Sequence, residues 1–142
     1  MEEALVAAQR GVGAVAGDLW WVPDDLIEFG DFDRSVRTRH QMRPCIVMQS
    51  DDAAQNSTCP TVLVIPCSSN TTSQRPWEDS LVLAETPLED PSIIKIHLMQ
   101  PVNREDLIQR GRRVGPIDQN ALGRLRVHLL WNLGLVPNLP NF

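Results

Sequence analysis

Apolar residues form short runs along the first two thirds of the chain. Residues 18–22, 44–48 and 61–67 consist mainly of Leu, Val, Ile, Trp and Cys, and longer polar segments separate them. Such runs, bounded by Pro, Asp, Asn and Ser, predict strands. The second and third runs are almost continuously apolar, which predicts strands buried on both faces or lying within a small barrel. Further strands are predicted at residues 81–83 and 93–98, because Pro87 and Pro91 exclude a helix between them.

The spacing of apolar residues changes in the last third of the chain. Residues 103–110 predict a short helix, since Asn103 can cap it, acidic residues follow in its first turn and Gly111 ends it. A longer helix is predicted between Asp118 and Gly134, because leucines recur every three or four residues, at positions 122, 125, 129 and 133. We expect this leucine face to pack on the sheet.

These elements predict an α+β, mainly β fold: a small β-barrel of five or more short strands with a C-terminal α-helix. A chain of 142 residues has the usual size of one domain. We expect the barrel domain at residues 17–136. An N-terminal arm, residues 1–16, would precede it, and a C-terminal tail, residues 137–142, would follow it.

The composition is that of an ordinary folded protein, with 42% apolar and 22% charged residues. No apolar run reaches the roughly 20 residues needed to cross a bilayer, and the first residues are acidic. We therefore expect a cytoplasmic protein without membrane association. The three cysteines form no Cys-x-x-Cys pair and the three histidines do not cluster, so the sequence predicts no disulfide framework, no metal site and no cofactor.

The charge reverses abruptly between the first two predicted strands. Residues 24–33 contain five acidic residues and no base, whereas residues 34–43 contain four arginines and His40 but no acid. A second group of six arginines lies in the C-terminal third, and arginine suits bidentate phosphate contact. The net charge of −5 opposes nucleic-acid binding. Ion pairs within the chain, with the acidic segment folded over the basic one, are the alternative explanation.

Four segments, in this order, resemble the MazF/PemK family of toxins. The first is Gly17-Asp18-Leu19-Trp20-Trp21-Val22. The others are Arg43-Pro44 with the apolar strand that follows, an apolar strand that closes in the hydroxyl pair Ser68-Ser69, and Gln100-Pro101. The resemblance covers residue 17 to about residue 134. It implies the SH3-like barrel that the family shares with the gyrase inhibitor CcdB.

The resemblance also implies an activity and partners. Toxins of this family are metal-independent endoribonucleases that cleave single-stranded RNA. A ribose 2′-hydroxyl attacks the adjacent phosphorus, which leaves a 2′,3′-cyclic phosphate. Homodimerisation and neutralisation by a cognate antitoxin are implied in the same way. Two alternatives stay open: a non-catalytic protein of the same fold that binds a protein target such as gyrase, as CcdB does, and a plain structural barrel.

The resemblance assigns the chemistry to three residues. Arg43 matches the family's catalytic arginine, and Ser68 matches the strand-end Thr or Ser that donates to the scissile phosphate. For Arg43, an ion pair with the acidic segment is the structural alternative. His40 is the candidate proton acceptor, because neighbouring arginines disfavour its charged form. Met99 occupies a position where the family often has an acid, so the general base stays open between His40 and His97.

Further residues are candidates for RNA binding. Thr38 and Arg39 replace the Glu-Gln pair usual in the family, and the loop that contains them is longer than is typical, which predicts an unusual or relaxed cleavage sequence. Trp77 is expected either to stack on a base or to close one end of the barrel. The full set of RNA-binding candidates is Arg37, Thr38, Arg39, Ser69, Trp77, His97 and Gln100.

Overall fold

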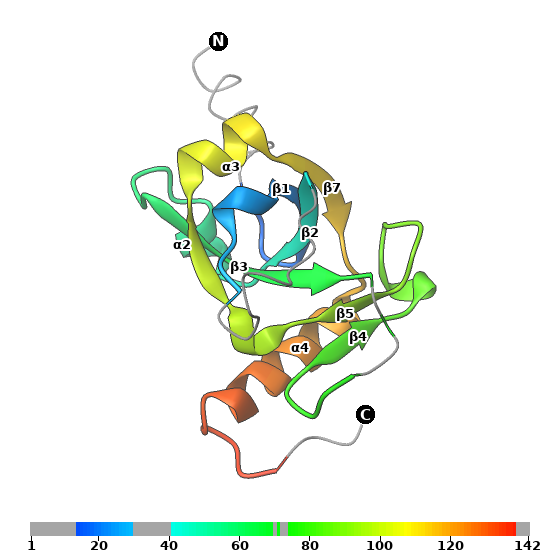
Figure 1. Cartoon of the computed structure of the whole chain (residues 1–142). Helices are drawn as coiled ribbons and strands as arrows, with labels where there is room; N and C mark the ends of the chain where they lie inside the picture. Colours follow the sequence, from blue (N-terminus) through cyan, green and yellow to red (C-terminus); the bar gives the residue numbers. More distant parts are fainter. Residues whose placement is uncertain (1–13, 30–40, 70, 72–73, 139–142) are drawn as a thin grey trace.

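The computed structural model describes residues 14–29, 41–69, 71 and 74–138 (Figure 1). Within these residues, one antiparallel sheet has the strand order β4-β5-β3-β2-β1-β7, and β6 pairs separately with β3. Its strands are β1 (Asp18–Pro23), β2 (Met42–Val47), β3 (Thr61–Ser68), β4 (Asp79–Leu81), β5 (Ser92–Ile94), β6 (Gln100–Asn103) and β7 (Arg112–Pro116). The first half of β3 pairs with β6 and its last two residues pair with β5. The sheet thus curls into a half-open barrel, and the expected mainly β fold with a C-terminal helix is confirmed.

Short helices connect the strands, and one longer helix follows β7. Its start is the expected one, because the side chain of Asp118 accepts hydrogen bonds from the backbone N–H groups of the first turn. Asn103 caps the preceding helix, which ends at Gly111 as predicted. No helix in the described part of the chain is long and apolar enough to cross a membrane. The helices are η1 (Asp24–Leu26), α2 (Asp51–Ala54), η2 (Leu83–Glu85), η3 (Ile96–Leu98), α3 (Arg104–Arg110) and α4 (Gln119–Asn132).

The first three strands are buried on both faces, as their continuous apolar sequences predict. Side chains of one face, including those of Trp20, Cys45 and Val64, fill the barrel interior. Side chains of the other face, including those of Ile46 and Ile65, form a second cluster with the leucines of α4. The helix α4 lies across this second face, next to β4 (Figure 1). Two apolar cores therefore share the same three strands.

Gly17 and Asp18 have separate structural roles at the start of β1. Gly17 has a φ of +85°, a conformation that side-chain-bearing residues rarely adopt. A Cβ at this position would lie 2.7 Å from Cδ2 of Leu122 on α4. The buried carboxylate of Asp18 accepts a 2.6 Å hydrogen bond from Nε of Arg113 on β7. This pair of residues thus joins β1 to both β7 and α4.

Several element boundaries differ from the sequence-based predictions. The strands expected at residues 81–83 and 93–98 end earlier than predicted, because Leu83 begins the 3-10 helix η2 and residues 96–98 form the 3-10 helix η3. The strands β6 and β7 and the short helix α2 were not predicted. Both strands contain Pro and charged or polar residues, which are disfavoured in sheet centres but tolerated at edges. The side chain of Leu133 is 58% exposed, so the buried leucine face of α4 ends earlier than expected.

The proposed division into arm, barrel and tail stays a prediction. Ala14 and Ala16, at the end of the expected arm, are buried, and the backbone N–H of Ala16 donates to the carboxylate of Asp51.

Candidate functional site

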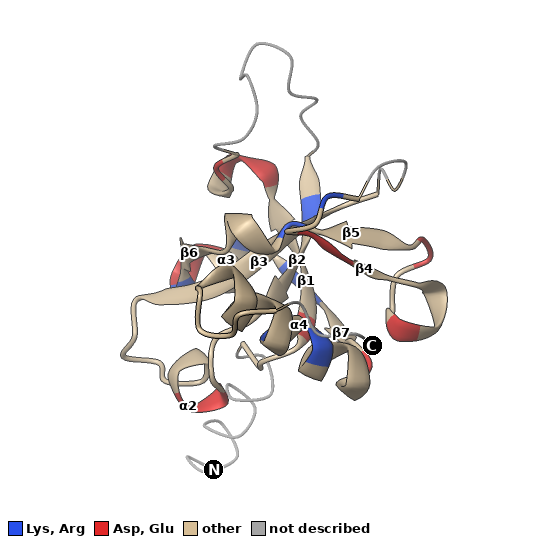
Figure 2. Ribbon diagram, turned by 90° about the horizontal axis from the view of Figure 1, so that it is seen from below, with Lys and Arg blue, Asp and Glu red and all other residues tan. Residues whose placement is uncertain are grey.

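Arg43 is buried at the start of β2, opposite Val22 of β1. Its Nε donates to Oδ1 of Asp24 at 2.9 Å, and its Nη1 donates to the carbonyl oxygen of Cys67 at 3.2 Å. The ring of Phe29 lies 4.5 Å from Cζ on one face of the guanidinium. Figure 2 shows the acidic η1 beside the start of β2 at one end of the molecule. The structural alternative, an ion pair with the acidic segment, is therefore present.

The ion pair leaves part of the guanidinium without a partner. An arginine side chain has five N–H donors. Arg43 uses two of them within the part of the chain that the structure describes, on Asp24 and Cys67. The pairing with Asp24 thus fixes the orientation of the side chain without exhausting its donors.

The structure brings Arg43 and Ser68 to the same end of the sheet. Cys45 of β2 is opposite Pro66 of β3. Arg43 and Ser68 each lie two residues beyond that pair, and Arg43 donates to the carbonyl group that immediately precedes Ser68. Ser68 is half-buried and Ser69 is exposed. A charged donor and two hydroxyl groups therefore lie within one short stretch of backbone.

A pocket of about 560 Å³ opens beside Arg43 and is lined by Ser69 and Cys67 at one end. Its lining includes a row across three strands, which we call the floor, in which Trp21 of β1 is opposite both Pro44 of β2 and Arg112 of β7. Residues 87–92, between η2 and β5, line the pocket from another side. The volume is within the range of sites that bind small molecules or parts of larger ligands.

Trp77 and His97 lie together but away from the pocket. Their rings meet edge to face with centroids 6.1 Å apart, and Trp77 is 39% exposed. Neither residue lines the pocket. Next to them, Nζ of Lys95 forms a 2.8 Å ion pair with the buried carboxylate of Glu78. The structure therefore places these two candidates in a second location, where Trp77 is exposed and His97 is half-buried.

Gln100 holds the chain segment that leads into the first loop. Its side-chain oxygen accepts from the backbone N–H of Glu28 at 2.8 Å, and its amide nitrogen donates to the carbonyl oxygens of Glu28 and Leu98. Both amide hydrogens are thereby used. The preceding residue, Met99, packs partly buried against the cluster beneath α4, so an apolar side chain occupies the position where an acid was sought.

Four of the predicted site residues lie outside the described part of the chain: Arg37, Thr38, Arg39 and His40. Conversely, sequence reasoning did not single out Asp24, Trp21 or Arg112 as site residues. Asp24 belonged to the acidic segment, Trp21 was assigned only to the first predicted strand, and Arg112 lies on the unpredicted strand β7. Only the pairing of strands reveals that the last two are neighbours.

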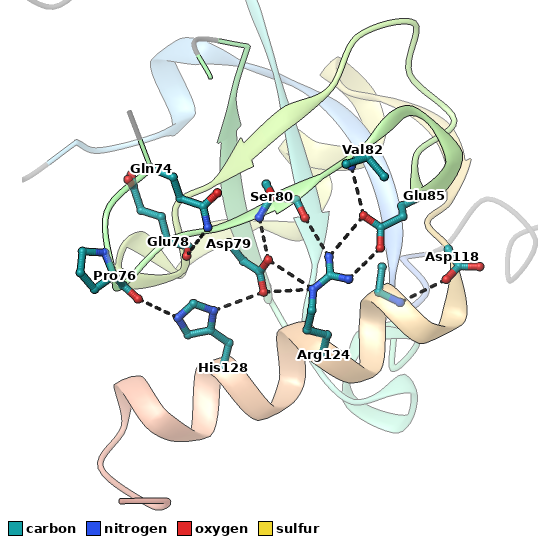
Figure 3. Close-up of polar contacts among 11 residues, drawn as sticks. Gln74, Pro76, Glu78, Asp79, Ser80, Val82, Glu85, Asp118, Arg124 and His128 are labelled. Atoms are coloured by element: carbon teal, nitrogen blue, oxygen red, sulfur yellow. Dashed lines mark hydrogen bonds and ion pairs between the residues drawn. The ribbon is translucent and has the colours of Figure 1, made fainter. Parts of the chain in front are cut away.

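A partly buried polar network connects α4 to β4 (Figure 3). Arg124 donates to the carboxylates of Asp79 and Glu85, with its closest contact at 2.7 Å to Glu85. Nδ1 of His128 lies 3.2 Å from Asp79, and its Nε2 lies 3.1 Å from the carbonyl oxygen of Pro76. The hydrogen bond from Arg124 lowers the pKa of Glu85. This network fixes the segment that ends in Trp77 relative to α4.

A comparison with protein families identifies one matching model, described as PemK-like, MazF-like toxin of type II toxin-antitoxin system, over residues 16–131. A search of curated proteins finds no matching sequence.

Solved structures with a similar fold include MazF proteins of two organisms. A MazE-MazF complex from Deinococcus radiodurans is 17% identical, with a TM-score of 0.59 over 87% of this chain and 98% of that one. MazF from the same organism is 19% identical, with a TM-score of 0.59 over 86% and 97%. The Mycobacterium tuberculosis toxin MazF-mt6 is 18% identical, with a TM-score of 0.56 over 68% and 91%. At these identities the similarity shows the fold.

Proposed function

Because the chain belongs to the PemK-like, MazF-like toxin family of type II toxin-antitoxin systems, we propose that it is a metal-independent endoribonuclease that cleaves single-stranded RNA. A ribose 2′-hydroxyl attacks the adjacent phosphorus, and the products carry 2′,3′-cyclic phosphate ends. The protein must stabilise the negative charge that develops on the phosphorane oxygens and assist the movement of a proton.

The position of Arg43 is the observation that best supports this proposal. Its guanidinium is oriented by Asp24, has N–H donors that no other described residue uses, and lines a pocket that Ser69 also lines. A pre-oriented cation needs little reorganisation when charge develops on the substrate. We assign phosphate stabilisation to Arg43 and a supporting hydrogen bond to Ser68, with Ser69 as an RNA-binding neighbour.

The remaining roles are assigned by position along the chain. His40 is the proposed proton acceptor, and Arg37, Thr38 and Arg39 are proposed to bind RNA from the same loop. Trp77 and His97 offer ring faces to RNA that extends beyond the pocket, since aromatic rings stack on bases of any sequence. Gln100 contributes by holding the backbone at Glu28, where this loop begins.

We also propose a cognate antitoxin and a second copy of the chain as partners, and the cytoplasm as the site of action. The Deinococcus radiodurans structures that share this fold include complexes of MazF with MazE, which supports an antitoxin as partner.

Incubation of the purified protein with single-stranded RNA in EDTA tests the activity. The expected result is cleavage that leaves cyclic phosphate ends, with a loss of about a hundredfold or more in rate for Arg43→Ala. Arg126→Ala is the matched control, because Arg126 is exposed on α4 and does not line the pocket. RNA that stays intact over a range of salt concentrations would overturn the proposal, and gyrase inhibition without cleavage would support the CcdB-like alternative.

A further inference from the structure

Side chains of opposite charge line the pocket beside Arg43 without pairing with each other. Arg112 lies on its floor, whereas Glu89 and Asp90 lie on the loop at residues 87–91. In the part of the chain that the structure describes, none of these three side chains has a hydrogen bond or an ion pair. By contrast, Arg113 on β7 is paired with Asp18, and Arg124 on α4 is paired with Glu85. A pocket that keeps both charges unpaired is suited to a ligand that carries both donors and acceptors.

The acidic loop is held against the sheet. Thr86 accepts a 3.1 Å hydrogen bond from the backbone N–H of Leu88 through its side-chain oxygen, and prolines at positions 87 and 91 restrict the backbone on both sides of the acids. Pro87 lies 3.9 Å from the position that a Cβ on Gly115 of β7 would occupy. The two carboxylates are therefore presented from a restrained segment next to β7.

The floor of the pocket contains an aromatic ring, that of Trp21, and next to it a cation, the guanidinium of Arg112. Trp21 is half-buried, and its cross-strand neighbour Arg112 is exposed. An accessible indole ring provides a stacking surface for a base of any sequence. An arginine beside it is placed to bind the phosphate that the base carries.

We propose that this pocket binds a guanine of the RNA substrate, adjacent to the phosphate at Arg43; the inference rests on the proposed ribonuclease function. The base stacks on Trp21, its N1–H and N2–H groups donate to the carboxylates of Glu89 and Asp90, and Arg112 contacts its phosphate.

The carboxylates decide the identity of the base. A carboxylate only accepts hydrogen bonds, and its two oxygens match two parallel N–H donors. Guanine has two adjacent donors, N1–H and N2–H, on its Watson–Crick edge. Adenine and cytosine each place a ring nitrogen acceptor beside the amino group, and uracil places carbonyl oxygens on both sides of its single N–H. Those acceptors would face the carboxylates and be repelled.

The same residues disfavour a basic peptide as the occupant. A lysine or arginine side chain that entered the pocket would meet Arg43 and Arg112 as well as the acids. A nucleotide instead presents its base to the acids and its phosphate to the arginines, so each charge in the pocket has a complementary group.

Sequencing of the RNA ends produced from a randomised RNA library tests the inference. The expected result is enrichment of guanine at one fixed position relative to the cut. With a defined oligonucleotide, inosine at that position lacks the N2 amino group and should lower kcat/KM by at least about tenfold. Absence of all cleavage would mean that the proposed function has failed, whereas cleavage without a guanine preference would overturn this inference alone.

The double variant Glu89→Gln, Asp90→Asn should reduce the guanine-to-inosine ratio of kcat/KM to near one. Asp52→Asn, an exposed acid on α2 outside the pocket, is the matched control and should keep the wild-type ratio. Arg112→Gln should raise KM for all sequences, because it removes a phosphate contact, and Arg126→Gln should not. Retention of the wild-type ratio in the double variant would overturn the inference.

Discussion

The Nε atom of Arg43 lies 2.9 Å from Oδ1 of Asp24, and the two side chains are only 9% and 4% exposed. Asp24 directly follows β1, and Arg43 is the second residue of β2. The ion pair therefore joins the two ends of the segment that links these strands. Because Nε points at Asp24, the guanidinium has one orientation, which the hydrogen bond to the carbonyl oxygen of Cys67 also favours. One ion pair thus contributes to the fold and orients the proposed catalytic cation.

Removal of Asp24 should destabilise the protein strongly. Asp24→Ala leaves the buried guanidinium of Arg43 uncompensated, which typically costs about 3–5 kcal/mol of the free energy of unfolding. Urea denaturation measures this loss. The neighbouring Asp25 provides the control, since its ion pair with Arg110 is largely exposed and Asp25→Ala should cost less than about 1 kcal/mol. Equal effects of the two substitutions would show that the buried pair contributes no more than a surface pair.

Two glycine substitutions should have opposite effects on stability. Gly17→Ala introduces a Cβ at a positive φ and within 2.7 Å of Leu122, so a loss of about 1–3 kcal/mol is expected. Gly123 lies exposed inside α4, with no atom within 4 Å of a new Cβ. Gly123→Ala should therefore stabilise the protein by about 0.5–1 kcal/mol. Thermal unfolding of both variants checks the sign, and a neutral Gly17→Ala would contradict the strain at β1.

Gln100 should protect the backbone at the base of the first loop. Gln100→Leu removes the hydrogen bonds to both backbone groups of Glu28, so the Glu28 amide should exchange its hydrogen faster. Hydrogen exchange followed by NMR or mass spectrometry reads this change. Gln109→Leu is the control, because the only hydrogen bond that this side chain makes to another described residue is to the side chain of Glu105, within α3. Unchanged exchange at Glu28 would mean that this amide is protected by other contacts.

The ion pair between Glu85 and Arg124 predicts a pH dependence of stability. The hydrogen bond from Arg124 lowers the pKa of Glu85 from its ordinary value of 4.5 in the folded protein. A lowered folded-state pKa stabilises the fold above the unfolded-state pKa, and this contribution is lost as the pH falls through the folded-state value. Glu85→Gln should therefore cost about 1 kcal/mol near neutral pH and progressively less below pH 4.5. Urea titrations at several pH values measure the difference, and a pH-independent cost would contradict it.

The three cysteines should differ in reactivity. Burial raises the pKa of the Cys67 thiol to about 12 and raises that of Cys45, so neither forms the reactive thiolate under native conditions. Hydrogen bonding at the backbone of Thr61 lowers the pKa of Cys59, which is only partly buried. Iodoacetamide should modify Cys59 in the folded protein and all three after unfolding. Native labelling of Cys67, detected by mass spectrometry, would indicate opening of β3.

The strands β1, β2 and β3 were predictable because their side chains are buried on both faces of the sheet. The runs that include Ile46 and Ile65 are apolar at almost every position, and a strand that packs on two cores requires this. The starts of α3 and α4 were predictable for a local reason, since Asn103 and Asp118 cap them through their own side chains. Local chemistry and local apolar runs thus gave the main elements.

The site was less accessible to prediction because long-range pairing creates it. The segment that begins at Arg112 contains two arginines, a glycine and a proline, so its composition does not predict a strand. Only its pairing with β1 makes it a strand beside Trp21. Asp24 was visible as one of several acids, but no periodicity indicates which of them reaches Arg43. Arg43 itself was found through its Arg-Pro motif, and its buried ion pair was foreseen as an alternative.

The pairing of β1 with β7 sets the order in which the nascent chain can fold. The first strand of the sheet has one edge on β2, which is synthesised soon afterwards, but its other edge stays open until Arg112–Pro116 emerges from the ribosome. Leu122 and Leu125 of α4, which cover the second face of the same strands, emerge later still. The polypeptide therefore cannot complete its sheet before Pro116 has been translated, or its second core before Leu125 has been.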